Sequence, residues 1–454
     1  MTYIRLPIRT LVLILVLFLP SFFITPETAL ARNKISLVRD AEIENTIRAY
    51  ATPLFQVAGL EPSSINIYLV NDKTLNAFVA GGQKLFLNTG LLMRSENAGQ
   101  IIGVIAHETG HIAGGHLSRT RDAMKNRSAH SILAMILGGA ATIGGRGDVG
   151  AAIIAGSQQS NLRSFLMYSR TQEGAADAAA MRYLDATRQS SEGMLEFFQI
   201  LGDQELLSVK RQDPYYRSHP LTTERINRVR NHITKSPYTT TPKNEELEER
   251  HRRMKAKLYA FLNPPTYTFR KYKKADNSLE ARYAKSIAYY RKADLEKAIP
   301  LIDSLLDERP NDPYFHELKG QMLFENAHIR EALPFYEKAV ALKPDSGLMR
   351  RDLARVQIEL KEPAYLKKAI PNLQVTLADD RLDPFTWRLL ATAYGQLGMM
   401  GESSLALGEE ALLRGKPADA KFHAGRAEKL LKKGSTGWIQ AQDIKQAANS
   451  DKGK

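Results

Sequence analysis

The chain contains no cysteine among its 454 residues. This absence excludes a disulfide framework, a thiolate zinc site, a catalytic thiol and a lipid-modified N-terminal cysteine. It does not place the protein in a reducing compartment, because oxidising compartments permit disulfides without requiring them. We therefore expect the mature chain to be soluble or peripherally attached, and not a lipoprotein.

Apolar runs long enough to cross a bilayer are also missing. The run from Leu11 to Ile24 has about 14 residues, short of the roughly 20 that a helical span needs. Arg5 and Arg9 precede this run and Ala29-Leu30-Ala31 follows it, which gives the three parts of a secretory signal. We predict that residues 1–31 are a signal peptide that is removed. The alternative is an uncleaved signal that keeps the chain in the inner membrane.

A second apolar segment, Ile132 to Ile154, is broken by the glycine-rich run 144–148. Neither half is long enough to span a bilayer as a straight helix. Glycine-rich apolar helices pack closely without lipid, so we interpret this segment as a packed hairpin near the active site. A mobile lid or a membrane-contacting element is the alternative.

The chain has a basic excess of 63 lysines and arginines over 49 acidic residues, a formal charge of +14. Such a charge is typical of proteins that bind nucleic acid or anionic membranes. An exported protein does not meet nucleic acid, so we expect no nucleic-acid partner. A solvated basic surface and a weak peripheral contact with anionic lipid both remain open.

The length predicts two folded parts. In the first part, residues 32–262, apolar spacing indicates a helix over 41–57, and short strands are expected over 65–70, 77–79 and 84–87. Ser95 is a plausible N-cap for the apolar helix that follows. We predict an α+β domain that is mostly helical with a small sheet.

An internal repeat defines the second part. Ala298 and Ala332 are 34 residues apart, as are Pro310 and Pro344, a period typical of tetratricopeptide repeats. Each such unit is a helix pair that must stack on its neighbours to share a core. We predict an all-α repeat solenoid of about three to four pairs. It should occupy residues 278–433, between a linker at 263–277 and a tail at 434–454.

The segment that carries chemistry is His107-Glu108-Thr109-Gly110-His111. Two histidines four residues apart project from one helix face and can place two imidazole nitrogens on one zinc ion. Glu108 lies between them in sequence, where it can take a proton from water and pass it to a leaving amine. This pattern alone is moderately specific.

A downstream acidic pair strengthens the pattern. Glu173 would complete a site of two histidines and one glutamate, and Asp177, on the same helical face, would accept the free ring N–H of His107. The alternative is a merely polar helix face, but the apolar run 178–181 indicates a buried helix whose carboxylate needs a partner. His116 is one residue out of step with a longer zinc-peptidase pattern, so we assign it a structural or surface role.

The three ordered motifs resemble those of the HtpX-like minigluzincin metallopeptidases. They are His107-Glu108-Thr109-Gly110-His111, Ser169-Arg170-Thr171-Gln172-Glu173-Gly174-Ala175-Ala176-Asp177 and Ser218-His219-Pro220-Leu221-Thr222-Thr223-Glu224-Arg225. The resemblance implies a minigluzincin fold, one zinc ion per chain and peptide-bond hydrolysis. It also places His219 near the metal, either as a stabiliser of the transition-state oxyanion or as a fourth zinc ligand that holds the enzyme latent.

The resemblance further implies that substrate backbone aligns on the edge strand formed by Asn76, Ala77, Phe78 and Val79, a mode that reads main chain more than side chain. Together with the predicted signal peptide and the repeats, the resemblance narrows to exported family members that act in the Gram-negative periplasm. Such members act in quality control of outer-membrane proteins. Unfolded or misfolded proteins are then the substrates, and the repeats would dock on the outer-membrane assembly machinery.

Two functions from different classes follow from these features. The first is a periplasmic zinc endopeptidase that cleaves misfolded or stalled chains. The second is a repeat-based chaperone or assembly scaffold whose metal site is latent. The complete set of His107, Glu108, His111 and Glu173 favours the enzyme, since a pure scaffold does not need a general base.

Overall fold

The computed structural model describes residues 36–81, 83–116, 159–202 and 213–450. The predicted signal peptide and the apolar segment Ile132 to Ile154 lie outside these residues. In the described part of the chain, no helix is both long and apolar enough to cross a membrane.

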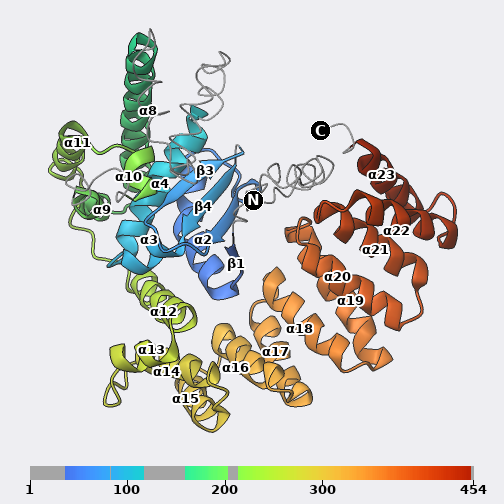
Figure 1. Cartoon of the computed structure of the whole chain (residues 1–454). Helices are drawn as coiled ribbons and strands as arrows, with labels where there is room; N and C mark the ends of the chain where they lie inside the picture. Colours follow the sequence, from blue (N-terminus) through green and yellow to red (C-terminus); the bar gives the residue numbers. More distant parts are fainter. Residues whose placement is uncertain (1–35, 82, 117–158, 203–212, 451–454) are drawn as a thin grey trace, which may run out of the picture. The chain divides into compact units, whose positions relative to one another are not determined.

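A small sheet forms one layer of the first domain (Figure 1). Its strands follow the order β1-β2-β4-β3, and their bounds are Leu37–Val38 (β1), Asn66–Val70 (β2), Ala77–Ala80 (β3) and Lys84–Asn88 (β4). β2 and β4 are parallel, whereas β1–β2 and β3–β4 are antiparallel. β3 is therefore an edge strand, and the strands predicted from alternation are confirmed within one or two residues.

Helices cover one face of this sheet. Burial alternates along β3 and β4, so that Val79, Leu85 and Leu87 enter a core shared with α2 (Ala41–Val57) and α4 (Ala98–Ala113). The other helices of this domain are α3 (Thr89–Arg94), α8 (Gln159–Ala186), α9 (Glu192–Gly202), α10 (Pro214–Ser218) and α11 (Thr223–Ile233), with a short 3-10 turn at Pro62–Ser64. The predicted α+β class is confirmed.

The N-cap of α4 differs from the prediction. Asn97, in extended conformation, accepts a hydrogen bond from the backbone N–H of Gln100 (3.0 Å) and caps the helix. Ser95 instead ends α3, and its Oγ donates to the carbonyl of Leu92 (2.9 Å). The sequence favoured Ser95 because serine is a common cap, but the turn between α3 and α4 is two residues longer than the pattern suggested.

α12 (Glu245–Leu262) ends just before Pro264 and Pro265, at which an α-helix cannot readily continue. Met254 and Leu258 belong to the core of the first domain, whereas Ala256 and Ala260 belong to the core of the first repeat. One helix thus contributes to two cores. The segment predicted as a linker contains α13 (Pro265–Lys271).

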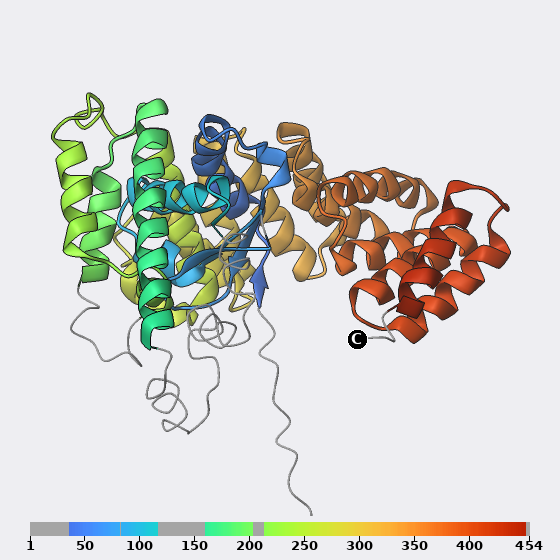
Figure 2. The same ribbon diagram turned by 90° about the horizontal axis from the view of Figure 1, so that it is seen from above.

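The repeats form consecutive antiparallel helices that each pack on the next one along the chain (Figures 1 and 2). Their bounds are Leu279–Tyr290 (α14), Leu295–Glu308 (α15), Pro313–Glu325 (α16), Ile329–Leu342 (α17), Gly347–Glu359 (α18), Pro363–Asp379 (α19), Pro384–Gln396 (α20), Met400–Leu413 (α21), Pro417–Leu430 (α22) and Thr436–Ser450 (α23). The helix pairs predicted from the period of 34 are present, but α14 to α23 form five pairs where three to four were expected. The segment predicted as a tail is helix α23, because Ala441, Ile444 and Ala448 give it an apolar face that packs with α22.

His251 in α12 predicts a pH dependence of stability. Its Nε2 lies 2.9 Å from Ser95 Oγ, whose proton is already donated to Leu92, so Nε2 carries the hydrogen of this contact. Burial, helped by the positive charges of Lys255 and Arg252, lowers the pKa of His251 to about 3. Below pH 6.5, the approximate pKa of histidine in the unfolded chain, the unfolded chain binds a proton at His251 and the folded chain does not. The free energy of unfolding therefore decreases as the pH is lowered.

We expect the wild type to lose about 2 kcal/mol more than His251→Gln in the free energy of unfolding between pH 7.5 and about pH 5, measured by denaturant titration. The exposed His328 provides the matched control, and His328→Gln should behave as the wild type. Equal losses in the wild type and in His251→Gln would show that His251 is not held neutral.

Candidate metal centre

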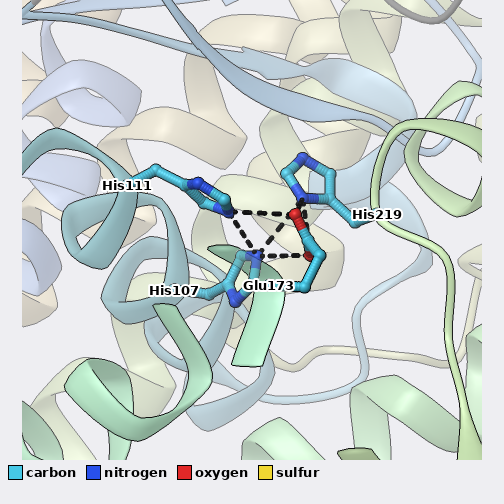
Figure 3. Close-up of side chains that lie close together, drawn as sticks. All are labelled: His107, His111, Glu173 and His219. Carbon is cyan, nitrogen blue, oxygen red and sulfur yellow. Dashed lines mark hydrogen bonds and ion pairs between the residues drawn. The ribbon is translucent and has the colours of Figure 1, made fainter. Parts of the chain in front are cut away.

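Four side chains from three segments converge in the first domain (Figure 3). His107 and His111 lie one turn apart on α4, and their Nε2 atoms are 3.1 Å apart. α8 approaches α4 closely because residue 110 is glycine: a Cβ there would lie 2.8 Å from the carbonyl oxygen of Ala176. This close approach allows Glu173 of α8 to reach both histidines.

The ligand atoms of these residues are closely spaced. Glu173 places its Oε2 3.3 Å from His107 Nε2 and its Oε1 3.3 Å from His111 Nε2. His219, which follows α10, places its Nδ1 3.2 Å from His107 Nε2 and 3.1 Å from Glu173 Oε2. Of the predicted site residues, His107, His111, Glu173 and His219 are therefore brought together.

The donor set fits a zinc ion. Zinc binds nitrogen and oxygen at about 2.0–2.1 Å, and tetrahedral geometry then puts neighbouring ligand atoms about 3.3 Å apart. The separations given above, 3.1–3.3 Å, are close to that value, and the ligand atoms of all four residues lie within 4.8 Å of one another. Imidazole and carboxylate are the ligand types that zinc accepts when thiolates are absent. These residues would hold the metal that the motifs imply.

Asp177 and Arg225 hold the ligand side chains in place through hydrogen bonds. Asp177 Oδ1 accepts from His107 Nδ1 at 2.9 Å, as predicted, and this contact fixes the ring so that Nε2 faces the other ligands. Arg225 of α11 donates twice to Asp177, from Nε at 2.6 Å and from Nη2 at 2.8 Å, and its Nη1 lies 3.1 Å from Glu173 Oε2. Burial raises the pKa of Asp177, but the hydrogen bonds with Arg225 and His107 outweigh burial and lower it to about 2.

The charges of this cluster call for a cation. Burial lowers the pKa of His107, yet hydrogen bonds with Asp177 and Glu173 outweigh that effect and raise it to about 10. Burial lowers the pKa of His111 to about 3, so this ring is neutral, as a metal ligand must be. Asp177 and Glu173 thus favour positive charge at His107 when no metal is bound, and a bound cation would supply that charge instead.

His116 lies next to the ligands without joining them. Its Nδ1 is 2.9 Å from Nδ1 of His111, and only 8 % of the residue is exposed. The structural role assigned from the sequence agrees with this position, because the contact orients the ring of a ligand.

Glu108 and Tyr215 lie on the side of His219. Glu108 is buried, and its Oε1, 3.5 Å from His219 Nε2, has no hydrogen-bond partner in the described part of the chain. Burial raises the pKa of Glu108. The ring of Tyr215 stacks on His219 with centroids 4.6 Å apart.

Sequence reasoning missed the roles of Arg225 and Tyr215. Arg225 was part of a recognised motif, so its position was available, but its partners were not. Tyr215 had no sequence signal, because its contact with His219 depends on how the turn after α10 folds.

The predicted substrate segment lies at the sheet edge. Strand β3 contains Ala77, Phe78 and Val79. The pairing of β3 with β4 begins at Asn76, whose carbonyl accepts a hydrogen bond from the N–H of Asn88 (3.0 Å). Just before β3, the carbonyl of Leu75 accepts from the N–H of Tyr215 (3.3 Å), which joins this strand to the segment that carries His219.

Comparison with known proteins agrees with this geometry. Residues 38–233 match Peptidase family M48. This segment is an M48 peptidase domain. The chain is also similar to the beta-barrel assembly-enhancing protease of Yersinia pestis, with 23% identity over 89% of this chain and 83% of that protein. A putative beta-barrel assembly-enhancing protease of Vibrio cholerae serotype O1 is 25% identical over the same shares.

A further relative, the metalloprotease LoiP of Escherichia coli K12, is 27% identical over 38% of this chain and 64% of that protein. The chain is thus a metalloendopeptidase with helical repeats after its M48 domain. The family implies zinc, and the cluster of His107, His111, Glu173 and His219 is a group able to hold such an ion.

Proposed function

We propose that the chain is an exported zinc endopeptidase that cleaves misfolded or stalled proteins on their way to the outer membrane. One zinc ion per chain would be held by His107, His111 and Glu173, with residues 32–262 as the catalytic domain. The observation that carries this proposal is the close spacing of the ligand atoms of His107, His111 and Glu173 beside a buried carboxylate, Glu108.

The chain's own residues supply the proton transfers. Zinc, when bound, polarises the scissile carbonyl and lowers the pKa of a water molecule. Glu108 takes the proton of the attacking water and delivers it to the leaving amine, and its free Oε1 is available for both steps. Asp177 and Arg225 keep His107 in one tautomer and orientation while this happens.

His219 has two candidate roles. Its Nδ1 has the spacing of a fourth ligand, which would fill the open position and hold the enzyme latent. Turned outward, the same ring would donate a hydrogen bond to the oxyanion of the transition state. Stacking on Tyr215 provides the surface against which the ring is held in the first arrangement.

The cellular role is proposed from the relatives. Proteins named beta-barrel assembly-enhancing protease align with 89% of this chain, including the repeats. The N-terminal signal supports a periplasmic location, and the repeats at 278–433, continued by α23, support docking on other proteins such as the outer-membrane assembly machinery.

A second function has one specific observation in its favour. The fourth-ligand spacing of His219 is what a latent site requires, so a repeat-based scaffold with a regulatory metal would show the same geometry. The two functions differ in whether hydrolysis is needed in the cell, and the Glu108→Gln variant separates them.

Metal analysis tests the proposed site. The purified protein should contain about one zinc per chain, and removal by a chelator should abolish hydrolysis of casein until zinc is restored. His111→Ala should lower the zinc affinity by at least about 100-fold, whereas His328→Ala, a surface change, should leave it unchanged. Unchanged hydrolysis by the metal-free protein would contradict the proposal.

The spectrum of the cobalt-substituted protein distinguishes the two roles of His219. Loss of a nitrogen ligand in His219→Phe would show that this histidine is the fourth ligand in the resting enzyme. An unchanged spectrum would show that it is not, and would leave the role of oxyanion stabiliser.

A further inference from the structure

A cavity of about 310 Å³ lies apart from the metal centre. Its walls come from β1, from the start of α2, and from helices α12, α16, α17 and α18, and none of the four clustered metal ligands lines it. The volume is at the lower end of the range of roughly 300–1,000 Å³ that is typical of ligand pockets. The cavity is therefore of a size for a small molecule or for a single long side chain.

Glu317 of α16 lines this cavity without a partner. The residue is only 8 % exposed, and its carboxyl group makes no hydrogen bond or ion pair with any residue that the structure describes. Burial raises the pKa of Glu317 well above its usual value, and Lys257 offsets only part of that effect. Lys257 is itself engaged by Asp40 (2.8 Å) and Glu42 (3.3 Å). A buried carboxyl group without a partner is costly, and a cation beside it would remove that cost.

The arginines that line the cavity do not supply this cation. Arg39 and Arg351 pair with other carboxylates, and Arg355 lies over the ring of Phe324 with 4.8 Å to its centroid. A metal ion does not fit either. Among the residues that the structure describes, side chains spaced to share a metal ion are found at the metal centre and not in this cavity. The missing charge is therefore that of an organic cation.

Two further oxygen-bearing side chains line the cavity, Tyr336 of α17 and Asp352 of α18. Burial raises the pKa of Tyr336 well above its usual value, and the carboxylates of Asp352 and Glu317 raise it further, so the three groups lie near one another. A primary ammonium group has three N–H donors and no acceptor, which matches three acceptor groups. Apolar walls, including Phe261 and Leu348, suit a hydrocarbon chain.

We infer that this cavity binds a primary ammonium group on an aliphatic chain, as in a diamine or a lysine side chain, with Glu317 as its counter-ion. Tyr336 and Asp352 would accept the remaining N–H groups, and the chain would lie against the apolar walls. A quaternary ammonium has no N–H to donate and would leave these acceptors unpaired. The inference does not depend on the proposed function.

Calorimetric titration of the zinc-loaded full chain tests the inference with three probes. They are the diamine cadaverine, Nα-acetyl-lysine amide, and pentanediol, which has the carbon chain of cadaverine without its charges. At least one of the two amines should bind at least about tenfold more tightly than pentanediol. Binding of cadaverine alone would assign the site to free amines, and binding of the lysine derivative would assign it to protein side chains as well. Equal binding of pentanediol, or no binding of either amine, would overturn the inference.

Three variants locate the bound amine. Glu317→Gln should weaken its binding at least about tenfold, since a hydrogen bond to a charged group is lost, and should unfold at about the temperature of the wild type. Glu337→Gln is the matched control, because Glu337 is exposed and does not line the cavity. Tyr336→Phe keeps the ring that packs against Gly320 and removes only the hydroxyl, so it should weaken binding about threefold.

Amines can also bind zinc, so the titration is repeated with His111→Ala. This variant should bind the amine as the wild type does, because His111 does not line the cavity. Loss of binding in His111→Ala would place the amine at the metal centre and overturn the inference. Undiminished binding to Glu317→Gln would overturn it as well.

Discussion

Replacing Glu108 with glutamine is expected to reduce peptide hydrolysis about 10²- to 10⁴-fold, while the protein stays folded and retains its zinc. Glutamine has nearly the same size as glutamate but cannot take up a proton. Glu108 is not one of the four clustered ligand residues, so the metal contacts should survive the change. The measurement is cleavage of casein or of a quenched fluorescent peptide, with zinc content determined on the same samples.

The size of this effect follows from the surroundings of the carboxylate. Glu108 is only 1 % exposed, so bulk water cannot easily replace it as the base. No carboxylate other than Glu108 and Glu173 contacts His219 in the described part of the chain, and Glu173 is engaged by His107 and His111. No other carboxylate in the described part of the chain is therefore placed to act as the general base in place of Glu108.

Glu44→Gln provides the matched control, because Glu44 is a glutamate on α2 that pairs with Arg39 and not with the metal centre. It should keep hydrolysis close to that of the wild type. Undiminished hydrolysis by Glu108→Gln would refute the proposed mechanism. Full rescue of a growth defect by a Glu108→Gln protein that no longer hydrolyses peptides would favour the scaffold function instead.

Much of this site was predictable because its residues lie at helical spacings. His107 and His111 are one turn apart, as are Glu173 and Asp177, so local periodicity already placed each pair on one helix face. The contact between Asp177 and His107 then followed from the needs of a metal-binding imidazole. The bounds of the helix over 41–57 were likewise predicted from apolar spacing.

What the sequence did not reveal depends on contacts between distant segments. Asp177 could be assigned to His107, but the two hydrogen bonds from Arg225 arise only when α11 packs against α8. The stacking of Tyr215 on His219 depends on how the turn after α10 folds, which no sequence pattern indicates. Helix α23 was predicted as a tail because its lysine-rich flanks concealed three apolar positions of helical spacing.

Arg225→Leu should lower the free energy of unfolding of the metal-free protein by about 3–5 kcal/mol. Arg225 is 5 % exposed and pairs with Asp177 and Glu173, both buried. Leucine fills part of the volume but leaves two carboxylates without their cation, which is the costly way to break a buried ion pair. Burial alone lowers the pKa of Arg225, but Asp177 outweighs it and raises the pKa further, so the guanidinium is charged throughout the accessible pH range.

Arg228, which lies on the same helix α11, is the matched control. It pairs with Glu224, whose side chain is 80 % exposed, so Arg228→Leu should cost less than about 1 kcal/mol. Denaturant titration with and without zinc measures both variants. Because zinc supplies positive charge to the same carboxylates, its addition should recover part of the loss in Arg225→Leu and none in Arg228→Leu. A loss in Arg225→Leu that zinc leaves unchanged would mean that Arg225 stabilises the packing of α11 and not the charge of the metal centre.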